Sequence, residues 1–435
     1  MKPAAGVFLA GAGSRLLPPS IPFRFFGAAV VFHALAWIAL VAGAEAVPRF
    51  AGGLGWPLAA LHLITLGVLA MTAIGASLQL LPVATRRSVG ATHAPAAIWW
   101  LYVPGVAVLA LGMGIAAPGL LAAGAVATVL ALSAYAALLA RNLAGARGMP
   151  VVVAHGWAAV AALVVVIVTA LSLAGSYVGA PALDRAIAQM LHIVYASYGF
   201  MGMLALGLSY ILVPMFALST APDERRAFAS FALAVTALLL AAVAAFGIAP
   251  RVTATGAIGA GAAAAALHIR LMAVALATGM RRRLGRSFAL VRIAWVLLGA
   301  SFVAALGTML DAPFDGGGTL FVLLVVGGWL LTFLLGVLQR IVPFLAAMHA
   351  GQRKTAAKRL PPAPSALTAD RPLALHFACH LGALALLAAA IVAESAWAVR
   401  AAGIAGAAGA LAFASFFVTA MRRMRLTDKA QGSAG

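Results

Sequence analysis

Long apolar stretches, separated by short polar or basic connections, make up most of the chain. A transmembrane helix needs about 20 mostly apolar residues, and we count twelve stretches of that length. The pattern predicts an all-α, polytopic membrane protein with twelve transmembrane helices, called spans 1 to 12 below. The predicted spans are residues 23–44, 57–82, 97–117, 119–140, 154–178, 187–214, 227–247, 253–280, 288–308, 318–345, 373–392 and 399–421.

The composition excludes a soluble protein. Of the 435 residues, 65% are hydrophobic and only 9% are charged, whereas a soluble domain has about 25% charged residues. The formal net charge of +20 could indicate a partner such as nucleic acid. The position of the charges argues against a nucleic-acid partner, because they lie in the connections between spans and not on one soluble surface.

The basic residues are unequally divided between the two sides of the predicted membrane. The connections after odd-numbered spans hold only Arg49, Arg185, Arg251 and Arg400, and the other connections and the two termini hold nearly all the rest. This positive-inside asymmetry predicts that both termini lie in the cytoplasm. A composition rich in Ala, Gly and Arg suggests a GC-rich bacterial genome, so we expect a bacterial inner membrane.

Two further features of the chain limit the interpretation. Residues 1–20 lack a convincing signal-peptide pattern, so we expect no cleaved signal. The single cysteine, Cys379, excludes a disulfide within the chain. The lipid bilayer is therefore the one partner that the composition predicts, and no nucleic acid is expected.

One eight-residue phrase, Gly-x6-Pro, occurs at the same end of three spans. The copies are GASLQLLP (75–82), GLSYILVP (207–214) and GVLQRIVP (336–343), which start 132 and 129 residues apart. A fixed period indicates a repeated structural unit. Because the copies close spans 2, 6 and 10, the chain divides into three units of four helices.

The three predicted units are residues 1–150, 151–286 and 287–435, within one integral membrane domain. A basic, proline-containing linker at 351–371 lies inside the third unit. We expect the motif glycine to let a neighbouring helix pack closely and the motif proline to stand near the end of its helix, where proline costs little. The phrase is therefore interpreted as packing and termination chemistry and not as a binding site.

Three segments give the chain its resemblance to a known family. They are PFRFF (22–26), LHLITLG (61–67) continuing to Leu81-Pro82-Val83, and Leu191-His192 continuing to Val213-Pro214-Met215. With twelve spans in three units, the chain resembles heme–copper oxidase subunit I, and in particular oxidase-like paralogues such as the NnrS family. That group is heme- and copper-associated and is linked to nitric oxide stress.

The resemblance bears most on two histidines. His62 lies 20 residues before Pro82 and His192 lies 22 before Pro214, so both stand about 30 Å from their motif proline, near the outer ends of spans 2 and 6. By position, the resemblance implies that His62 corresponds to a heme ligand and His192 to a copper ligand. It also implies heme b and copper as cofactors.

Other ligands that the family requires are missing. The corresponding positions of span 10 hold Leu323 and Phe321, and span 7 has no histidine. Carboxylates occur only in loops and at span ends. We therefore expect no oxygen reductase activity. His62 and His192 could still bind one b-type heme as a pair, or one metal ion with sulfur from Met190, Met201 or Met203, or they could be helix residues hydrogen-bonded to their neighbours.

A second candidate metal site lies at the start of span 11. His376, Cys379 and His380 are spaced i, i+3 and i+4, which places them on one helix face and could allow copper or zinc to bind. Alternatively, they are only polar residues near a helix start.

The remaining histidines give less information. His268 and Arg270 lie inside span 8, where Arg270 either reaches toward the cytoplasm or pairs with an anion such as a heme propionate. His33 could face the interior from span 1. The others are placed in or near cytoplasmic loops, at His93, His155 and His349.

The sequence thus predicts a bacterial inner-membrane protein that binds heme, copper or both, and serves respiration-linked metal or heme handling or nitric oxide stress. Two alternatives stay open. One is a transporter for a metal or small molecule, although transporter repeats usually come as two halves. The other is a non-catalytic assembly partner of a respiratory complex, whose subunits would then be its partners.

Overall fold

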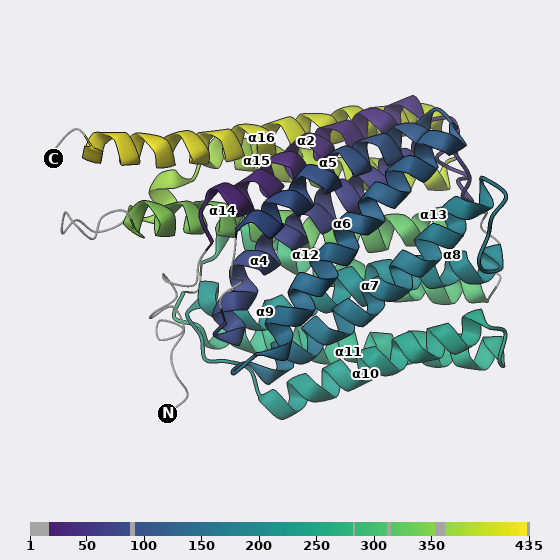
Figure 1. Cartoon of the computed structure of the whole chain (residues 1–435), viewed down its shortest axis with the longest axis horizontal. Coiled ribbons are helices and arrows are strands. Elements are labelled where there is room, and N and C mark those ends of the chain that lie inside the picture. The colour runs from purple at the N-terminus through teal and green to yellow at the C-terminus, as the bar shows by residue number, and fades with distance from the viewer. Residues whose placement is uncertain (1–16, 88–91, 282, 311–314, 353–361, 433–435) are drawn as a thin grey trace.

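The protein consists of helices that run from one end of the molecule to the other (Figure 1). The computed structural model describes residues 17–87, 92–281, 283–310, 315–352 and 362–432. Within these residues there is no strand, and twelve helices are long and apolar enough to cross a membrane. The predicted all-α, twelve-span membrane fold is therefore confirmed, with boundaries that differ from the predicted ones by a few residues.

The spans follow the chain in order. They are Ser20–Ala42 (α2), Trp56–Thr85 (α3, η2, α4), His93–Gly114 (α5), Pro118–Ala144 (α6), Pro150–Ser176 (α7), Arg185–Ala217 (α8, η3, α9), Glu224–Ala245 (α10), Pro250–Thr278 (α11), Gly285–Met309 (α12), Gly317–Ala350 (α13, η4 and most of α14), Asp370–Val392 (α15) and Ala396–Leu426 (most of α16). A 3₁₀ turn, Pro364–Leu367 (η5), precedes α15.

The second span of each predicted unit lies in the interior of the bundle. In spans 2, 6 and 10, buried residues make up 67%, 89% and 61% of the most apolar window, and in every other span at most 50%. These inner spans are the ones that carry the Gly-x6-Pro phrase. The repeated phrase therefore marks the core of the fold.

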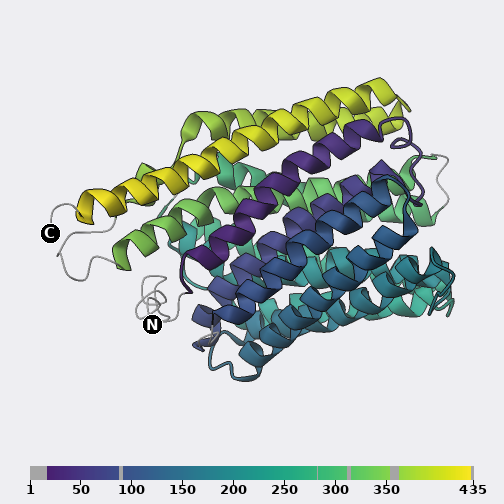
Figure 2. The ribbon, with the colours of Figure 1, turned by 45° about the horizontal axis from the view of Figure 1, so that its top comes forward.

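The order of neighbouring helices recurs three times around the bundle. The third and fourth spans of each unit pair closely, as α5 with α6, α10 with α11, and α15 with α16. Successive units meet through α6 and α7, through α11 and α12, and through α16 and α2. The last span thus packs on the first, as the yellow and purple helices show in two views (Figures 1 and 2). This order agrees with three four-helix units, whose structural equivalence stays a prediction.

The contact between α16 and α2 depends on small residues. A Cβ atom added to Gly406 would lie 2.2 Å from the Trp37 ring, and one added to Gly403 would lie 2.4 Å from Cγ2 of Val41. In a membrane, helices associate mainly by such close packing, because lipid is as apolar as the side chains themselves. Glycines of α16 therefore bring the two ends of the chain together.

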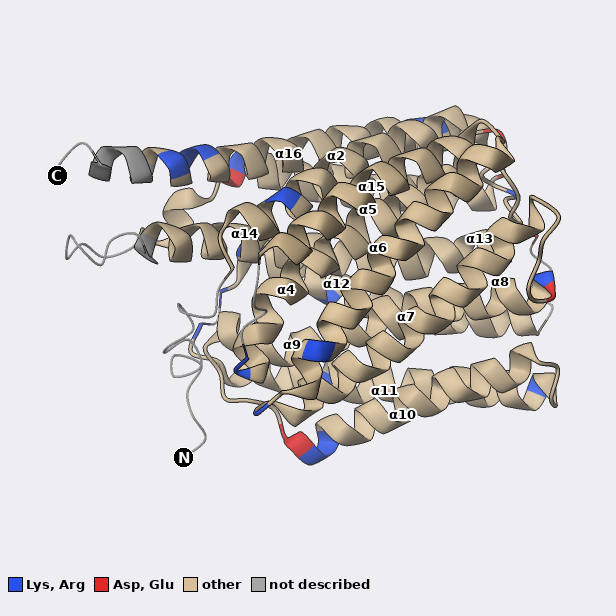
Figure 3. Cartoon of the chain, viewed as in Figure 1, with Lys and Arg blue, Asp and Glu red and all other residues tan. Residues whose placement is uncertain are grey.

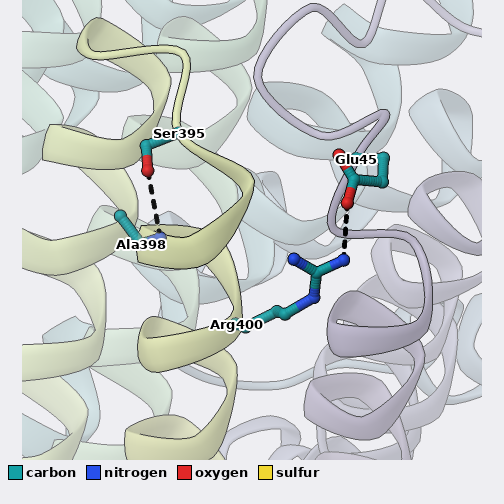
Figure 4. A network of polar contacts seen from close by, with 4 residues as sticks. All are labelled: Glu45, Ser395, Ala398 and Arg400. Atoms are coloured by element: carbon teal, nitrogen blue, oxygen red, sulfur yellow. Dashed lines mark hydrogen bonds and ion pairs between the residues drawn. The ribbon is translucent and has the colours of Figure 1, made fainter.

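Two ion pairs join the same regions at one end of the bundle. Arg400 binds Glu45 at 2.5 Å (Figure 4), and Arg49 binds Glu394. The Glu45 and Arg49 side chains are 77% and 73% exposed. Exposed ion pairs contribute at most about 1 kcal/mol, so they add little to the close helix packing.

The two ends of the bundle differ in charge. Arginines gather at the end where α2 begins and α16 finishes, called the basic end (Figure 3). At the opposite end, Arg49 and Arg400 are paired with carboxylates. The asymmetry expected from the sequence is thus present in the fold.

Each motif glycine is a point of close contact with the first helix of its own unit. An added Cβ would lie 2.9 Å from Cβ of Phe25 at Gly75, 2.6 Å from Cβ of His155 at Gly207, and 2.7 Å from the Ser287 carbonyl oxygen at Gly336. All three distances are below van der Waals contact. The packing role predicted for the motif glycine is confirmed.

The motif proline marks the helix end in only two of the three copies. Helices α4 (Met71–Thr85) and α9 (Gly202–Ala217) stop three residues after the proline. The next residues, Arg86 and Leu218, have φ of 57° and 55°, which turns the chain out of the helix. In contrast, α14 (Thr332–Gln352) continues for nine residues beyond Pro343. The predicted linker at 351–371 therefore begins later, and residues 353–361 lie outside the described part of the chain.

We predict that Gly207→Ala destabilises the protein by about 1–3 kcal/mol, because the new methyl group overlaps the backbone-anchored Cβ of His155. Gly299→Ala in α12 is the matched control, since nothing lies within 4 Å of its added Cβ. Thermal unfolding in detergent measures both. Equal unfolding midpoints for the two variants would contradict the packing role.

We also predict that Arg400→Ala lowers the free energy of unfolding by no more than about 1 kcal/mol, whereas Gly406→Ala lowers it by at least as much as Gly207→Ala. The same unfolding assay compares them. A larger loss in Arg400→Ala than in Gly406→Ala would show that the ion pairs, and not the glycine contacts, close the bundle.

Candidate metal sites

His62 and His192 lie beside each other near the end of the bundle opposite the basic end. Their ring centres are 6.3 Å apart and their ring planes are inclined by 20°. His62 is the last residue of α3 (Trp56–His62), and His192 lies in α8 (Arg185–Val194). Each stands about 10 Å below the start of its span. The structure therefore brings together the two histidines that the repeat register pairs.

Local sequence fixes the starts of both helices. Before α8, the Asp184 carboxylate accepts the backbone N–H groups of Ala186 and Ile187 at 2.9 and 3.1 Å, which is an N-cap. Helix α3 has Pro57 in its first turn, where the missing N–H has no cost. These starts set the depth of His62 and His192 in the bundle.

Hydrogen bonds orient both rings in the same way. Nδ1 of His62 lies 3.0 Å from the Leu58 carbonyl oxygen, so Nδ1 carries the proton. Nδ1 of His192 lies 3.3 Å from the hydroxyl of Thr169, whose own proton goes to the Val165 carbonyl at 2.8 Å. The hydroxyl can then accept from Nδ1 of His192, which also has a hydrogen bond to the backbone of Val166, so Nδ1 carries the proton. Both rings therefore present the Nε2 lone pair, the arrangement found in metal-binding histidines.

A π-helical segment follows each histidine. The segment η2 (Leu63–Ala70) begins directly after His62, and η3 (Tyr195–Met201) begins three residues after His192. The third inner span has η4 (Leu323–Leu331). The segments start 12, 12 and 13 residues before the motif glycines. Such segments often occur at functional sites, and nothing in the sequence predicted these three.

The third inner span has apolar residues where the other two have histidine. Phe321 lies in α13 (Gly317–Val322), and Leu323 is the first residue of η4. Met190 lies two residues before His192, about 200° away around the helix axis, and lines a cavity that His192 does not line. The candidate centre therefore consists of two imidazoles.

A second group of histidines is buried where spans 1, 10 and 11 meet. His33, His376 and His380 are at most 2% exposed. The ring centres of His376 and His380 are 5.5 Å apart, and those of His33 and His376 are 6.4 Å apart. Cys379 is only partly buried, and its Cβ would lie 3.1 Å from a Cβ at Gly409 of α16.

The expected trio in span 11 is therefore not gathered about one point. Cys379 faces α16, and His33 stands next to the two histidines instead. Among the residues that the structure describes, no group of three or more His, Cys, Asp or Glu side chains is placed to hold a metal ion. Metal binding by His376, Cys379 and His380 stays a prediction.

A third group of polar rings lies between spans 5, 6 and 8. Tyr210 lies between His155 and His268, with ring centres 5.6 and 5.1 Å away. Nδ1 of His268 is 3.2 Å from the Tyr210 hydroxyl. The sequence interpretation placed His155 and His349 in or near loops. Both side chains are buried, the former 1% and the latter 5% exposed. Both lie near a helix end, where the chain pattern gives no indication of burial.

The two candidate residues of span 8, His268 and Arg270, lie on different sides of the helix. His268 is 1% exposed, whereas Arg270 is exposed on the surface of α11. Because the two residues lie about 200° apart on the helix, Arg270 does not face the histidine group. Its exposure agrees with a side chain that reaches along the lipid-facing surface.

Two apolar cavities adjoin the inner spans. One, with an empty volume of about 740 Å³, lies between α2, α3, η4 and α15 and is lined by Ala60, Leu61 and Ile64 of span 2. The other, about 1160 Å³, lies between spans 6, 7, 8, 9 and 10 and is lined by Met190 and Val194 of span 6. These lining residues flank His62 and His192, but the histidines themselves line neither cavity.

Comparison with known proteins does not assign the chain to a family. No protein-family model matches the chain, and no curated protein is significantly similar to it. The resemblance to heme–copper oxidase subunit I therefore stays a prediction from the sequence.

Proposed function

We propose that this chain is a membrane protein in which His62 and His192 together bind one metal centre, either the iron of a b-type heme or a copper ion, and that it does not reduce oxygen. The observation that supports the proposal is the placement of the two rings. An ion bound by two imidazole nitrogens, about 2 Å from each, separates the ring centres by roughly 6 Å, and the pair stands at 6.3 Å.

The donor set favours these two centres over others. Heme iron takes four ligands from its macrocycle, so two axial imidazoles complete its coordination. Copper(I) accepts two ligands, and imidazole suits copper. A zinc site usually has at least three protein ligands, and no third His, Cys, Asp or Glu joins the pair in the described residues.

The absence of further ligands supports the negative part of the proposal. Oxygen reduction in the resembling family needs additional histidines in spans 7 and 10. Helix α10 has none, and span 10 has Phe321 and Leu323 at the relevant depth. The resemblance to the oxidase-like family implies that a bound centre would serve metal or heme handling linked to respiration, or nitric oxide stress.

The orientation in the membrane is part of the same proposal. The positive-inside rule places the basic end, with both termini, in the cytoplasm of a bacterial cell. His62 and His192 then lie near the outer surface of the inner membrane. The spans give little support to the transport alternative. Ion-coupled transport usually uses buried acids, whereas in each described span Asp and Glu occur only at the ends.

We predict that membranes containing the protein show either a b-type band in the reduced-minus-oxidised spectrum or bound copper in metal analysis. His62→Ala and His192→Ala should each abolish the band or the copper, because one imidazole cannot hold the centre alone. His93→Ala, at an exposed helix start, is the matched control. A purified protein with neither heme nor copper would overturn the proposal.

We further predict that Thr169→Val weakens metal binding roughly 10–100-fold while leaving both ligands in place, because it removes the acceptor that orients His192. Thr169→Ser keeps the hydroxyl and should retain the wild-type affinity. Competition with a chelator of known affinity measures the change. Equal affinities in the valine and serine variants would show that the Thr169 hydroxyl does not orient a ligand.

A further inference from the structure

We propose that His376 and His380 form a second, separate metal site, buried inside the bundle, which binds copper(I) through one nitrogen of each ring. The site lies on α15 (Asp370–Val392), about 10–15 Å from the start of that helix at the basic end. It shares no ligand with the His62–His192 pair, so it does not depend on the function proposed above.

Hydrogen bonds define which nitrogen of His380 is free. The Thr332 hydroxyl donates its proton to the Gly327 carbonyl oxygen at 2.8 Å. Since that proton is used, the hydroxyl accepts from Nε2 of His380, also at 2.8 Å. Nε2 therefore carries the ring proton, and Nδ1 presents a lone pair. That nitrogen is buried and has no hydrogen-bond partner.

The same reasoning applies to His376. Its Nδ1 lies 3.1 Å from the Gly409 carbonyl oxygen, which can only accept, so Nδ1 carries the proton. Nε2 then presents a lone pair, and it too is buried without a partner. Two unpaired acceptors thus stand on successive turns of one helix, with ring centres 5.5 Å apart.

Such a pair of acceptors can bind a positively charged ligand. More than nine in ten buried polar groups in proteins have a hydrogen-bond partner, and these two nitrogens are among the buried side-chain atoms of the described residues that lack one. His33 does not supply the missing donor. Its Nε2 accepts from the Trp37 indole N–H at 3.2 Å. The ring proton is then on Nδ1, and no hydrogen bond joins that N–H group to either lone pair on α15.

The charge of the surrounding side chains favours copper(I) over a divalent ion. The nine Asp and Glu residues of the chain lie in loops or near span ends, and none of those whose side chains the structure describes is buried. A divalent ion would therefore place two uncompensated charges in a low-dielectric interior, where a buried charge is costly. Copper(I) brings one charge, accepts two ligands, and binds imidazole well.

The smaller cavity ends beside this pair. Its walls include Trp37, Gly327 and Leu384. The first donates to His33, the second accepts from Thr332, and the third lies one turn beyond His380 on α15. The other end of the cavity reaches Val47 and Phe50 in the connection between spans 1 and 2. The cavity therefore extends from the end opposite the basic end to residues that neighbour the pair, although neither histidine lines it.

The test uses the full-length protein carrying His62→Gln and His192→Gln, so that only the second site is counted. Copper(I) is titrated without oxygen against a chromogenic copper(I) chelator. We expect one copper per chain. Adding His376→Gln or His380→Gln should weaken binding by more than the roughly 10–100-fold typical of losing an outer-shell partner. Cys379→Ser, the matched control, should bind as the parent does.

X-ray absorption of the copper-loaded parent tests the same assignment without altering the site, in case either histidine variant fails to fold. We expect nitrogen neighbours and no sulfur. Sulfur in the first shell, or loss of binding in Cys379→Ser, would assign the metal to the cysteine and overturn the proposal. So would a parent that binds no copper(I), or one that binds zinc in preference to it.

Discussion

Close contact between each inner span and the first helix of its own unit sets the geometry of this protein. In lipid there is no water to expel from between helices, so association depends on how near the backbones can approach. The glycines at 75, 207 and 336 permit approaches at which a single methyl group would collide with the neighbour. These contacts fix the depth and the direction of the three inner helices, and hence of the histidines they carry.

The second constraint is the supply of hydrogen-bond partners inside the membrane. His62 uses a backbone carbonyl of its own helix, and His192 uses Thr169. His376 reaches across to the backbone of α16, where Gly409 leaves its carbonyl accessible. Each bond takes up one ring nitrogen and leaves the other with a lone pair. Among the described residues, the interior thus contains several imidazole lone pairs and no buried Asp or Glu side chain.

Much of the fold could be predicted from the sequence, because the length and spacing of apolar runs set the number of spans directly. The pairing of His62 with His192 followed from the register of the repeated phrase. The sequence did not show which face of its helix each side chain occupies. Most spans are apolar all around, so the pattern gives no direction. The burial of His155 and the side of α15 on which Cys379 lies could not be predicted for that reason. The π-helical segments have no composition that distinguishes them from the α-helices around them.

The π-helical segments divide each inner helix into two halves with different roles. The half with the motif glycine packs against its unit, and the other half begins at or near the histidines or their apolar replacements. A π turn contains one residue more than an α-helical course over the same length, and one residue corresponds to about 100° of rotation. Removing a single residue from Leu63–Ala70 would turn His62 away from His192 while the glycine contacts stayed in place. In evolutionary terms, the face that a ligand presents can change by insertion or deletion of one residue, with no change in the packing that holds the bundle together.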